Sequence, residues 1–277
     1  MIAVPEPVST LPELVSADPC PALRGPVIGY QGFRYGPMPP VQRLVLPSPI
    51  VQVMLGFGAP VLTMDTVARA SASVLSLASP LKMTATVGRH SGQVHGLVVQ
   101  LTPIGAYRIF GVPMSEWNVP FLDPAHLFDR SLAGLPERLA ECPSWAGRFA
   151  LLDRLLTARL AEAPRCSPEV GYAWHELRAA RGRVAVRELA AATGWSSRHL
   201  ERRFREQVGL PPKAAAQILR LWSALQFQEL GLPLARVAAD AGFHDQSHFN
   251  HVFRAMVGSP PTRTRVERVF WDGVVDR

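Results

Sequence analysis

The feature that most constrains the fold of this 277-residue chain is an internal repeat near its C-terminus. Residues 186–212 read VRELAAATGWSSRHLERRFREQVGLPP, and residues 235–261 read ARVAADAGFHDQSHFNHVFRAMVGSPP. The matched glycines Gly194 and Gly242 are 48 positions apart, whereas the matched residues after them are 49 apart. The second copy therefore carries one extra residue in its turn. A match of this length predicts two copies of one supersecondary unit.

Each copy has the residue pattern of a helix-turn-helix. Ala190 and Ala238 are small residues where a second helix must approach closely, and Gly194 and Gly242 can adopt the positive φ of a tight turn. The candidate caps of the second helix are Ser196 or Ser197 in the first copy and Asp245 in the second. Two ordinary hairpins of a structural helix bundle are the alternative interpretation.

The positive charge of the chain is concentrated in the same region. The formal net charge is +7, and residues 175–277 hold 16 Lys or Arg against 10 Asp or Glu, a net of +6. Nearly all of these cations are arginines, which form forked hydrogen bonds with phosphate and guanine. The charge distribution therefore predicts an anionic partner for the C-terminal region.

The second copy resembles the signature of the AraC/XylS family of bacterial regulators almost position for position. The stretch ILRLWSAL (218–225) is similar to the linker-helix pattern of that family, in which an Arg is followed four positions later by an Ala. The resemblance covers residues 170–268. A weaker one links LTPIGAYRIFGVP (101–113) to the sensor half of a subgroup.

The resemblance implies a sequence-specific DNA-binding transcription regulator, and activation and repression both remain open. Two recognition helices, at 196–208 and 245–257, would enter successive major grooves of double-stranded DNA. A rigid helix at 214–230 would join them. A helix of about 17 residues spans roughly 25 Å, which suits grooves about 34–36 Å apart on one face of the duplex.

The resemblance also implies the residues that face the bases. They are Arg198, Glu201 and Arg202 in the first recognition helix, and Gln246, Ser247, Asn250 and His251 in the second. Glu201 could accept from cytosine or pair with Arg198 or Arg205 on its own helix. The residues expected on phosphates are Arg203, Arg205, Lys213, Arg254 and Arg263. For each of these, a solvated surface charge is the alternative.

The remaining sequence predicts a mixed α+β chain. Residues 1–26 are expected to form a loosely ordered leader, and residues 27–165 a sensor or dimerisation domain. Its strands should extend to about residue 112 as a small cupin-like β-barrel or sandwich, and helices should occupy 115–163. Four apolar runs predict strands, namely Ile50–Phe57, Ser73–Leu77, Met83–Val87 and Leu97–Leu101. The double helix-turn-helix domain is expected at 170–268.

Two features of the N-terminal domain suggest how it could be controlled. An apolar pocket for an unidentified small-molecule effector is expected in the strand-rich part, with Trp117 or Tyr107 near its edge. The helix 145–162, capped by Ser144, carries an apolar stripe that includes Phe149, Leu152 and Leu156, and Arg148 is expected at one of its polar positions. The stripe predicts either a homodimer contact or packing within its own domain.

The sequence gives little indication of enzyme chemistry. We expect no cofactor, because phosphate-binding and dinucleotide motifs are missing, and no metal site, although His244, His248 and His251 have helical spacing. The alternative to a regulator is a DNA-linked enzyme, either a repair methyltransferase or a cupin-like catalyst. The methyltransferase would need a reactive cysteine cluster near the N-terminus, where only Cys20 occurs.

The cellular setting follows from composition. The cysteines are three and scattered, and neither a signal peptide nor an apolar run of about 20 residues is present. A cytoplasmic location without membrane contact is the resulting expectation.

Overall fold

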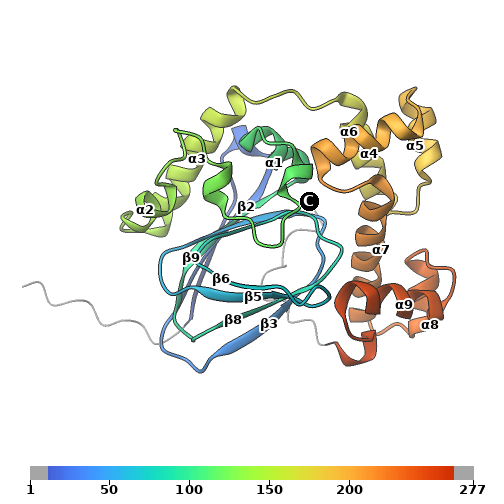
Figure 1. Cartoon of the computed structure of the whole chain (residues 1–277), viewed down its shortest axis with the longest axis horizontal. Coiled ribbons are helices and arrows are strands. Elements are labelled where there is room, and N and C mark those ends of the chain that lie inside the picture. Colours follow the sequence, from blue (N-terminus) through green and yellow to red (C-terminus); the bar gives the residue numbers. More distant parts are fainter. Residues whose placement is uncertain (1–11, 265–277) are drawn as a thin grey trace, which may run out of the picture.

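A computed structural model of the chain describes residues 12–264 and has two antiparallel sheets in its N-terminal half, residues 12–161. The strands are β1 (Glu13–Ala17), β2 (Val27–Tyr35), β3 (Val41–Val45), β4 (Val51–Gly56), β5 (Val61–Asp65), β6 (Ser71–Val74), β7 (Leu77–Ser79), β8 (Thr86–His90) and β9 (Val94–Leu101). The five-stranded sheet has the order β1-β2-β9-β4-β7 and the four-stranded sheet the order β3-β8-β5-β6. This sandwich-like arrangement and the helical C-terminal part confirm the predicted α+β class (Figure 1).

The five-stranded sheet is covered on both of its faces. Its central strand β9 is buried at almost every residue, which is typical of a strand with a layer on each side. One face meets the four-stranded sheet, where Arg43 of β3 donates to the Tyr35 hydroxyl of β2 over 3.4 Å. The other face is covered by helices, of which α3 (Trp145–Ala161) is the longest. The Phe149 ring of α3 stacks on Tyr30 of β2 at 5.6 Å.

Helix α3 begins where the sequence predicts. The Ser144 hydroxyl accepts from the backbone N–H of Gly147, so the predicted cap is confirmed. Its apolar stripe packs within the chain, with Phe149, Leu152 and Leu156 buried. Of the two alternatives, the structure therefore has the stripe packing on its own domain. The remaining helical segments of this half are η1 (Pro21–Leu23), α1 (Pro103–Phe110), η2 (Met114–Trp117), η3 (Pro124–Leu127) and α2 (Leu135–Ala140).

Several predictions for this half need correction. Part of the predicted leader is ordered, because β1 pairs with β2 along its whole length, while residues 1–11 lie outside the described residues. Residues 103–110 form helix α1 rather than strand, since Thr102 caps Gly105 N–H and Gly111 ends the helix with a φ of 69°. The run Ser73–Leu77 is divided between β6 and β7, which belong to different sheets.

Two further predictions differ from the structure. The run Met83–Val87 overlaps strand β8 only at its last two residues. Arg148, expected at a polar position of α3, is buried, and its Nε donates to the Leu139 carbonyl over 2.9 Å. Its guanidinium also lies 4.8 Å from the centre of the Trp145 ring. The hydrogen bond and the aromatic ring replace the water that an exposed arginine would bind.

The C-terminal helical region, residues 168–264, contains two groups of helices joined by one long helix (Figure 1). The helices are α4 (Pro168–Ala179), α5 (Val186–Thr193), α6 (Ser197–Val208), α7 (Pro212–Glu229), α8 (Leu234–Asp240), α9 (Gln246–Val257) and η4 (Pro261–Arg263). The predicted linker helix corresponds to α7, which is 18 residues long. Among the described residues, no helix combines the length and apolar character that crossing a bilayer requires.

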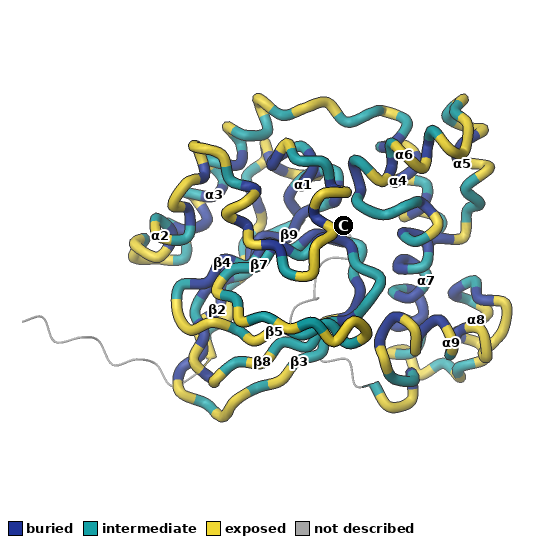
Figure 2. Tube along the Cα trace, viewed as in Figure 1, coloured by how far each residue is buried: buried dark blue, intermediate teal, exposed yellow. Residues whose placement is uncertain are grey.

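The N-terminal half contacts both groups of helices. Helix α6 packs on α1 and η2, and the backbone N–H of Ala85 donates to the Met256 carbonyl of α9 over 2.7 Å. Between these two contacts, the Trp222 indole of α7 donates to the Pro47 carbonyl over 2.7 Å. Buried segments accordingly follow α7 along its length (Figure 2).

Candidate nucleic-acid interface

The first helix-turn-helix module consists of α5, a tight turn and α6. The turn residue Gly194 has a φ of 69°, and Ala190 is buried where the two helices approach each other. The hydroxyl of Ser196 accepts from His199 N–H, so Ser196 rather than Ser197 is the cap. The apolar side of α6 is completely buried at Leu200, Phe204 and Val208. These contacts confirm the predicted module and fix which face of α6 points outward.

The second module repeats this arrangement with α8 and α9. Gly242 has a φ of 80°, Ala238 is fully buried, and the Asp245 carboxylate accepts from His248 N–H over 2.7 Å. Backbone and histidine hydrogen bonds lower the pKa of Asp245, so this cap is ionised at neutral pH. Its negative charge beside the helix N-terminus favours the helix.

The outward face of α6 carries the residues predicted to face bases in the first module. Arg198, Glu201 and Arg202 are all exposed. The Arg202 side chain contacts His199, and the Nη2 atom of Arg202 lies 3.2 Å from the Nδ1 atom of His199. The His199 ring in turn packs edge-on against Trp195. Within the described part of the chain, Glu201 has no ion pair with Arg198 or Arg205. The helical-pairing alternative for Glu201 is therefore not seen.

The corresponding residues of α9 are less uniform. Gln246, Ser247 and His251 are exposed, whereas Asn250 is half-buried. The Asn250 Oδ1 atom is buried and has no hydrogen-bond partner among the described residues. An unpaired buried amide oxygen is costly. Asn250 therefore differs from the other three predicted base-facing residues of α9 in being half-buried with an unpaired amide oxygen.

Four of the five predicted phosphate contacts are exposed, namely Arg205, Lys213, Arg254 and Arg263. Arg203 is half-buried instead, and its guanidinium is bonded within the chain. Its Nη1 pairs with Glu206 at 2.7 Å, and its Nη2 donates to the Ser167 hydroxyl over 3.0 Å. The pattern of charges along α6 does not predict the hydrogen bond to Ser167, because Ser167 lies 36 residues away in the chain.

Two arginines that the site prediction did not include hold the turn of the second module. Arg220 of α7 donates to the Gly242 carbonyl over 3.2 Å, and its guanidinium lies 5.4 Å from the centre of the Phe243 ring. Arg183, between α4 and α5, packs so closely that a Cβ at Gly242 would lie 2.9 Å from its Cγ. The linker helix and the segment between α4 and α5 thus both contact the turn that precedes α9. Arg220 is part of the linker-helix pattern, which was the sequence signal for it.

Two of the three histidines of the second module, His244 and His248, take part in capping and packing. His244 Nδ1 lies 3.0 Å from Asp245, and His248 Nδ1 accepts from the backbone N–H of His244. His251 is exposed on α9. No group of three or more potential metal ligands occurs within residues 12–264. The sulfur of Cys20, the cysteine that the methyltransferase alternative required, lies 3.6 Å from the Thr157 hydroxyl oxygen.

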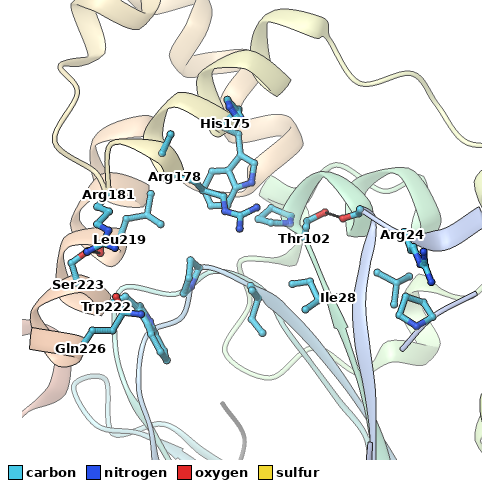
Figure 3. A pocket seen from close by; sticks show the side chains of 18 of the residues that line it. Arg24, Ile28, Thr102, His175, Arg178, Arg181, Leu219, Trp222, Ser223 and Gln226 are labelled. Atoms are coloured by element: carbon cyan, nitrogen blue, oxygen red, sulfur yellow. Dashed lines mark hydrogen bonds between the residues drawn. The ribbon is translucent and has the colours of Figure 1, made fainter. Parts of the chain in front are cut away.

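The two residues predicted near the edge of an effector pocket, Trp117 and Tyr107, are core residues. Trp117 is completely buried and Tyr107 nearly so, and both belong to the hydrophobic core. The Trp117 ring packs edge-on against Phe110 instead of lining a cavity. A cavity of about 790 Å³ lies elsewhere, between the N-terminal half and helices α4 and α7 (Figure 3).

Comparison with known sequences matches residues 189–267 to a family model described as a helix-turn-helix domain. The chain is also 37% identical over 65 residues to an uncharacterised HTH-type transcriptional regulator, YbfI of Bacillus subtilis (strain 168). The match covers 24% of each chain, so this chain spans about a quarter of the length of that relative.

Three solved structures are similar in arrangement at low sequence identity. ToxT from Vibrio cholerae O395 is 10% identical, with 84% of this chain and 95% of ToxT covered and a TM-score of 0.43. The C-terminal domain of AraT, a response regulator from Geobacillus stearothermophilus, is 22% identical over 39% of this chain and 95% of that domain, with a TM-score of 0.35. The AraC-like transcriptional activator CuxR is 12% identical over 81% and 89%, with a TM-score of 0.29.

Proposed function

Since residues 189–267 match a helix-turn-helix domain model, we propose that the protein is a sequence-specific DNA-binding transcription regulator of the AraC type. The observation that carries the proposal is the pair of modules with solvent-exposed recognition faces on α6 and α9, joined by one continuous helix. The side chains exposed on these faces include Arg198 and Arg202 on α6 and Gln246 on α9, which are residue types that pair with base edges.

The length of α7 supports reading of two successive major grooves. Its 18 residues correspond to roughly 27 Å at about 1.5 Å per residue. Each recognition helix lies beside one end of α7, so the separation of the modules approaches the roughly 34–36 Å between grooves on one face of DNA. A modest bend of the duplex would make up the difference.

Within this proposal the two exposed faces have distinct tasks. Arg198, Glu201 and Arg202 would read the first groove, and Gln246, Ser247, Asn250 and His251 the second. Arginine pairs with guanine, glutamine and asparagine pair with adenine, and glutamate accepts from cytosine. Arg205, Lys213, Arg254 and Arg263 would hold phosphates. Arg203 would join them only after giving up Glu206 and Ser167.

We also propose that residues 27–165 form a sensor or assembly domain that controls the DNA-binding domain at 170–268. The support is that this half contacts both modules. Ala85 bonds to Met256 in the second module, and a Cβ at Gly209 after α6 would lie 3.5 Å from the Met114 Cβ. A change in either contact would alter the positions of the two recognition helices, α6 and α9.

A substitution experiment separates base reading from phosphate contact. The DNA is a duplex enriched from a random-sequence pool by the full chain. Arg202→Ala and Gln246→Ala should each weaken binding to it by about 1–3 kcal/mol and relax the preference at one base pair. The two base pairs should lie about one helical turn apart. Arg205→Ala and Arg254→Ala should weaken enriched and random DNA equally.

Matched controls come from the first helices of the two modules. Arg187 of α5 and Arg236 of α8 are also exposed, and their Ala variants should leave base preference unchanged. Equal losses on enriched and random DNA for Arg202→Ala and Gln246→Ala would show that the assigned reading faces are wrong. If only the first-module change matters, α9 is a structural copy and not a reader.

A further inference from the structure

The turn before α6 restricts the orientation of a histidine on that helix. Trp195 follows the turn residue Gly194, and the His199 ring packs edge-on against its indole, with the two ring centres 4.4 Å apart. The backbone N–H of His199 donates to the Ser196 hydroxyl over 3.2 Å, so the helix cap also fixes the main chain at this residue. The half-buried imidazole of His199 is therefore held from two sides.

One nitrogen of this imidazole contacts a residue predicted to face bases. The Nη2 atom of Arg202 lies 3.2 Å from Nδ1 of His199. Because a guanidinium group only donates, Nδ1 is the acceptor, and the proton of the imidazole is on Nε2. The guanidinium has more N–H groups than this bond uses. The remaining ones can make the paired hydrogen bonds to O6 and N7 of guanine.

Arg198 provides a comparison on the same helix. It is exposed, and within residues 12–264 its side chain has no hydrogen bond or ion pair. Consecutive residues of a helix do not face each other, so Arg198 does not share the acceptor of His199. Of these two arginines, Arg202 is the one whose guanidinium is held by another side chain of the described part of the chain.

The second module has the corresponding histidine with a different partner. His248 of α9 corresponds to His199, and the centre of its ring lies 5.7 Å from that of the Phe243 ring. Its Nδ1 accepts from the backbone N–H of His244 over 3.3 Å. His244 belongs to the turn that is one residue longer in the second copy. The acceptor is thus used within the turn, and the exposed His251 has no side-chain partner among the described residues.

We propose that His199 is a positioning residue that holds Arg202 ready to bind guanine in the first major groove. The inference rests on the proposed function, because it concerns the same recognition helix. A flexible arginine loses conformational entropy when it is fixed on a base, and the bond to His199 removes part of that loss before DNA binds. The bond also limits the directions in which the guanidinium group can present its paired donors, and guanine is the base that accepts such a pair.

The test measures base discrimination with the enriched duplex. Discrimination is the ratio of the dissociation constants for duplexes altered and unaltered at the base pair where Arg202→Ala relaxes the preference. That pair should be G·C. His199→Phe keeps a ring against Trp195 but has no acceptor, and it should lower discrimination at this pair about threefold. His199→Asn places an oxygen near the position of Nδ1 and should keep discrimination within about twofold of the unaltered chain.

A double-mutant cycle separates positioning from a general structural effect. His199→Phe should have no further effect at this pair once Arg202→Ala is present, whereas His199→Phe and Arg198→Ala should act additively at the pair that Arg198 reads. In the second module, His248→Phe and His251→Ala should also be additive. Circular dichroism shows whether each variant folds. Nitrogen-15 NMR of the unaltered chain should show the His199 proton on Nε2, which gives a readout that needs no substitution.

Each outcome decides a separate statement. Equal losses of discrimination in His199→Phe and His199→Asn, additive effects of His199→Phe and Arg202→Ala, or a proton on Nδ1 of His199 would overturn the positioning role and leave the proposed function intact. A base pair other than G·C at the position read by Arg202 would overturn the guanine assignment. A chain that enriches no sequence from the random pool would overturn the proposed function together with this inference.

Discussion

The connection between the two halves should depend strongly on one buried side chain, Gln207. It lies on the inner side of α6, on the opposite face from the proposed base readers, and is completely buried. Its Oε1 accepts from the Ser167 backbone N–H over 3.0 Å and from the Cys166 thiol over 2.9 Å, while its Nε2 donates to the Ser167 hydroxyl over 2.9 Å. Gln207 thereby attaches the connecting segment between α3 and α4 to α6.

The magnitude follows from these bonds. Each neutral hydrogen bond contributes about 1 kcal/mol net, and a buried donor left without a partner costs about 1–3 kcal/mol. We therefore expect Gln207→Ala to lower the free energy of unfolding by about 2–4 kcal/mol. Gln207→Met, which keeps most of the volume but neither polar atom, should cost about 1–3 kcal/mol. The difference between the two variants reports the packing contribution.

Urea denaturation of the full chain, followed by circular dichroism, measures these changes. With a slope of about 2 kcal/mol per molar urea, Gln207→Ala should lower the midpoint of the transition containing the helices by roughly 1–2 M. Gln217→Ala on α7 is the control, because Gln217 is half-buried and makes no side-chain hydrogen bond among the described residues. If both variants shift the midpoint equally, the three hydrogen bonds are not what holds the segment.

Three other predictions concern titration and module orientation. Burial raises the pKa of Cys166 from 9.0 to about 11, so the folded chain should lose stability as pH rises across this interval, and urea midpoints of Cys166→Ser should lose that slope. Burial, assisted by nearby arginines, lowers the pKa of His95 from 6.5 to about 4. Stability should therefore fall as pH drops through this interval, and thermal melts of His95→Phe should lack that component. Arg220→Gln removes the contacts with Gly242 and Phe243. It should reduce discrimination at the base pairs assigned to α9 about tenfold while leaving those of α6 unchanged in the enriched-duplex assay.

Local signals in the sequence determined the helix-turn-helix region. The repeat, the glycines at the two turns and the polar caps predicted both modules, and the family resemblance predicted the linker helix. The structure has these helices within two residues of the expected bounds. Such features can be predicted because capping and positive φ depend on neighbours within a few residues. Thr102 and Gly111 are capping residues of the same kind at the two ends of α1. The strand-like composition around them nevertheless led to a predicted strand region that extended to about residue 112.

Contacts between segments that are distant in the chain determine the surroundings of several arginine side chains, and the sequence alone did not predict these surroundings. Arg203 has the sequence context of a phosphate-binding residue, yet its partner Ser167 becomes a neighbour only when the connecting segment folds onto α6. Arg148 has the sequence context of a surface residue, yet a carbonyl from α2 and an aromatic ring enclose it. Hydrogen-bond partners from other elements decide whether an arginine is buried, and periodicity within one helix carries no information about them.

The position of the cavity follows the same rule. The sequence indicated apolar material in the strand-rich part, but close packing fills that space with the chain's own side chains, including Trp117. The cavity between the two halves exists because Arg24 and Ile28 on one side and Arg178 and Trp222 on the other are brought together across more than 140 residues of chain. The sequence by itself determined the two modules, since their geometry is local. Only the tertiary structure decided how the N-terminal half meets them, because that depends on which surfaces remain after each half has packed its own core.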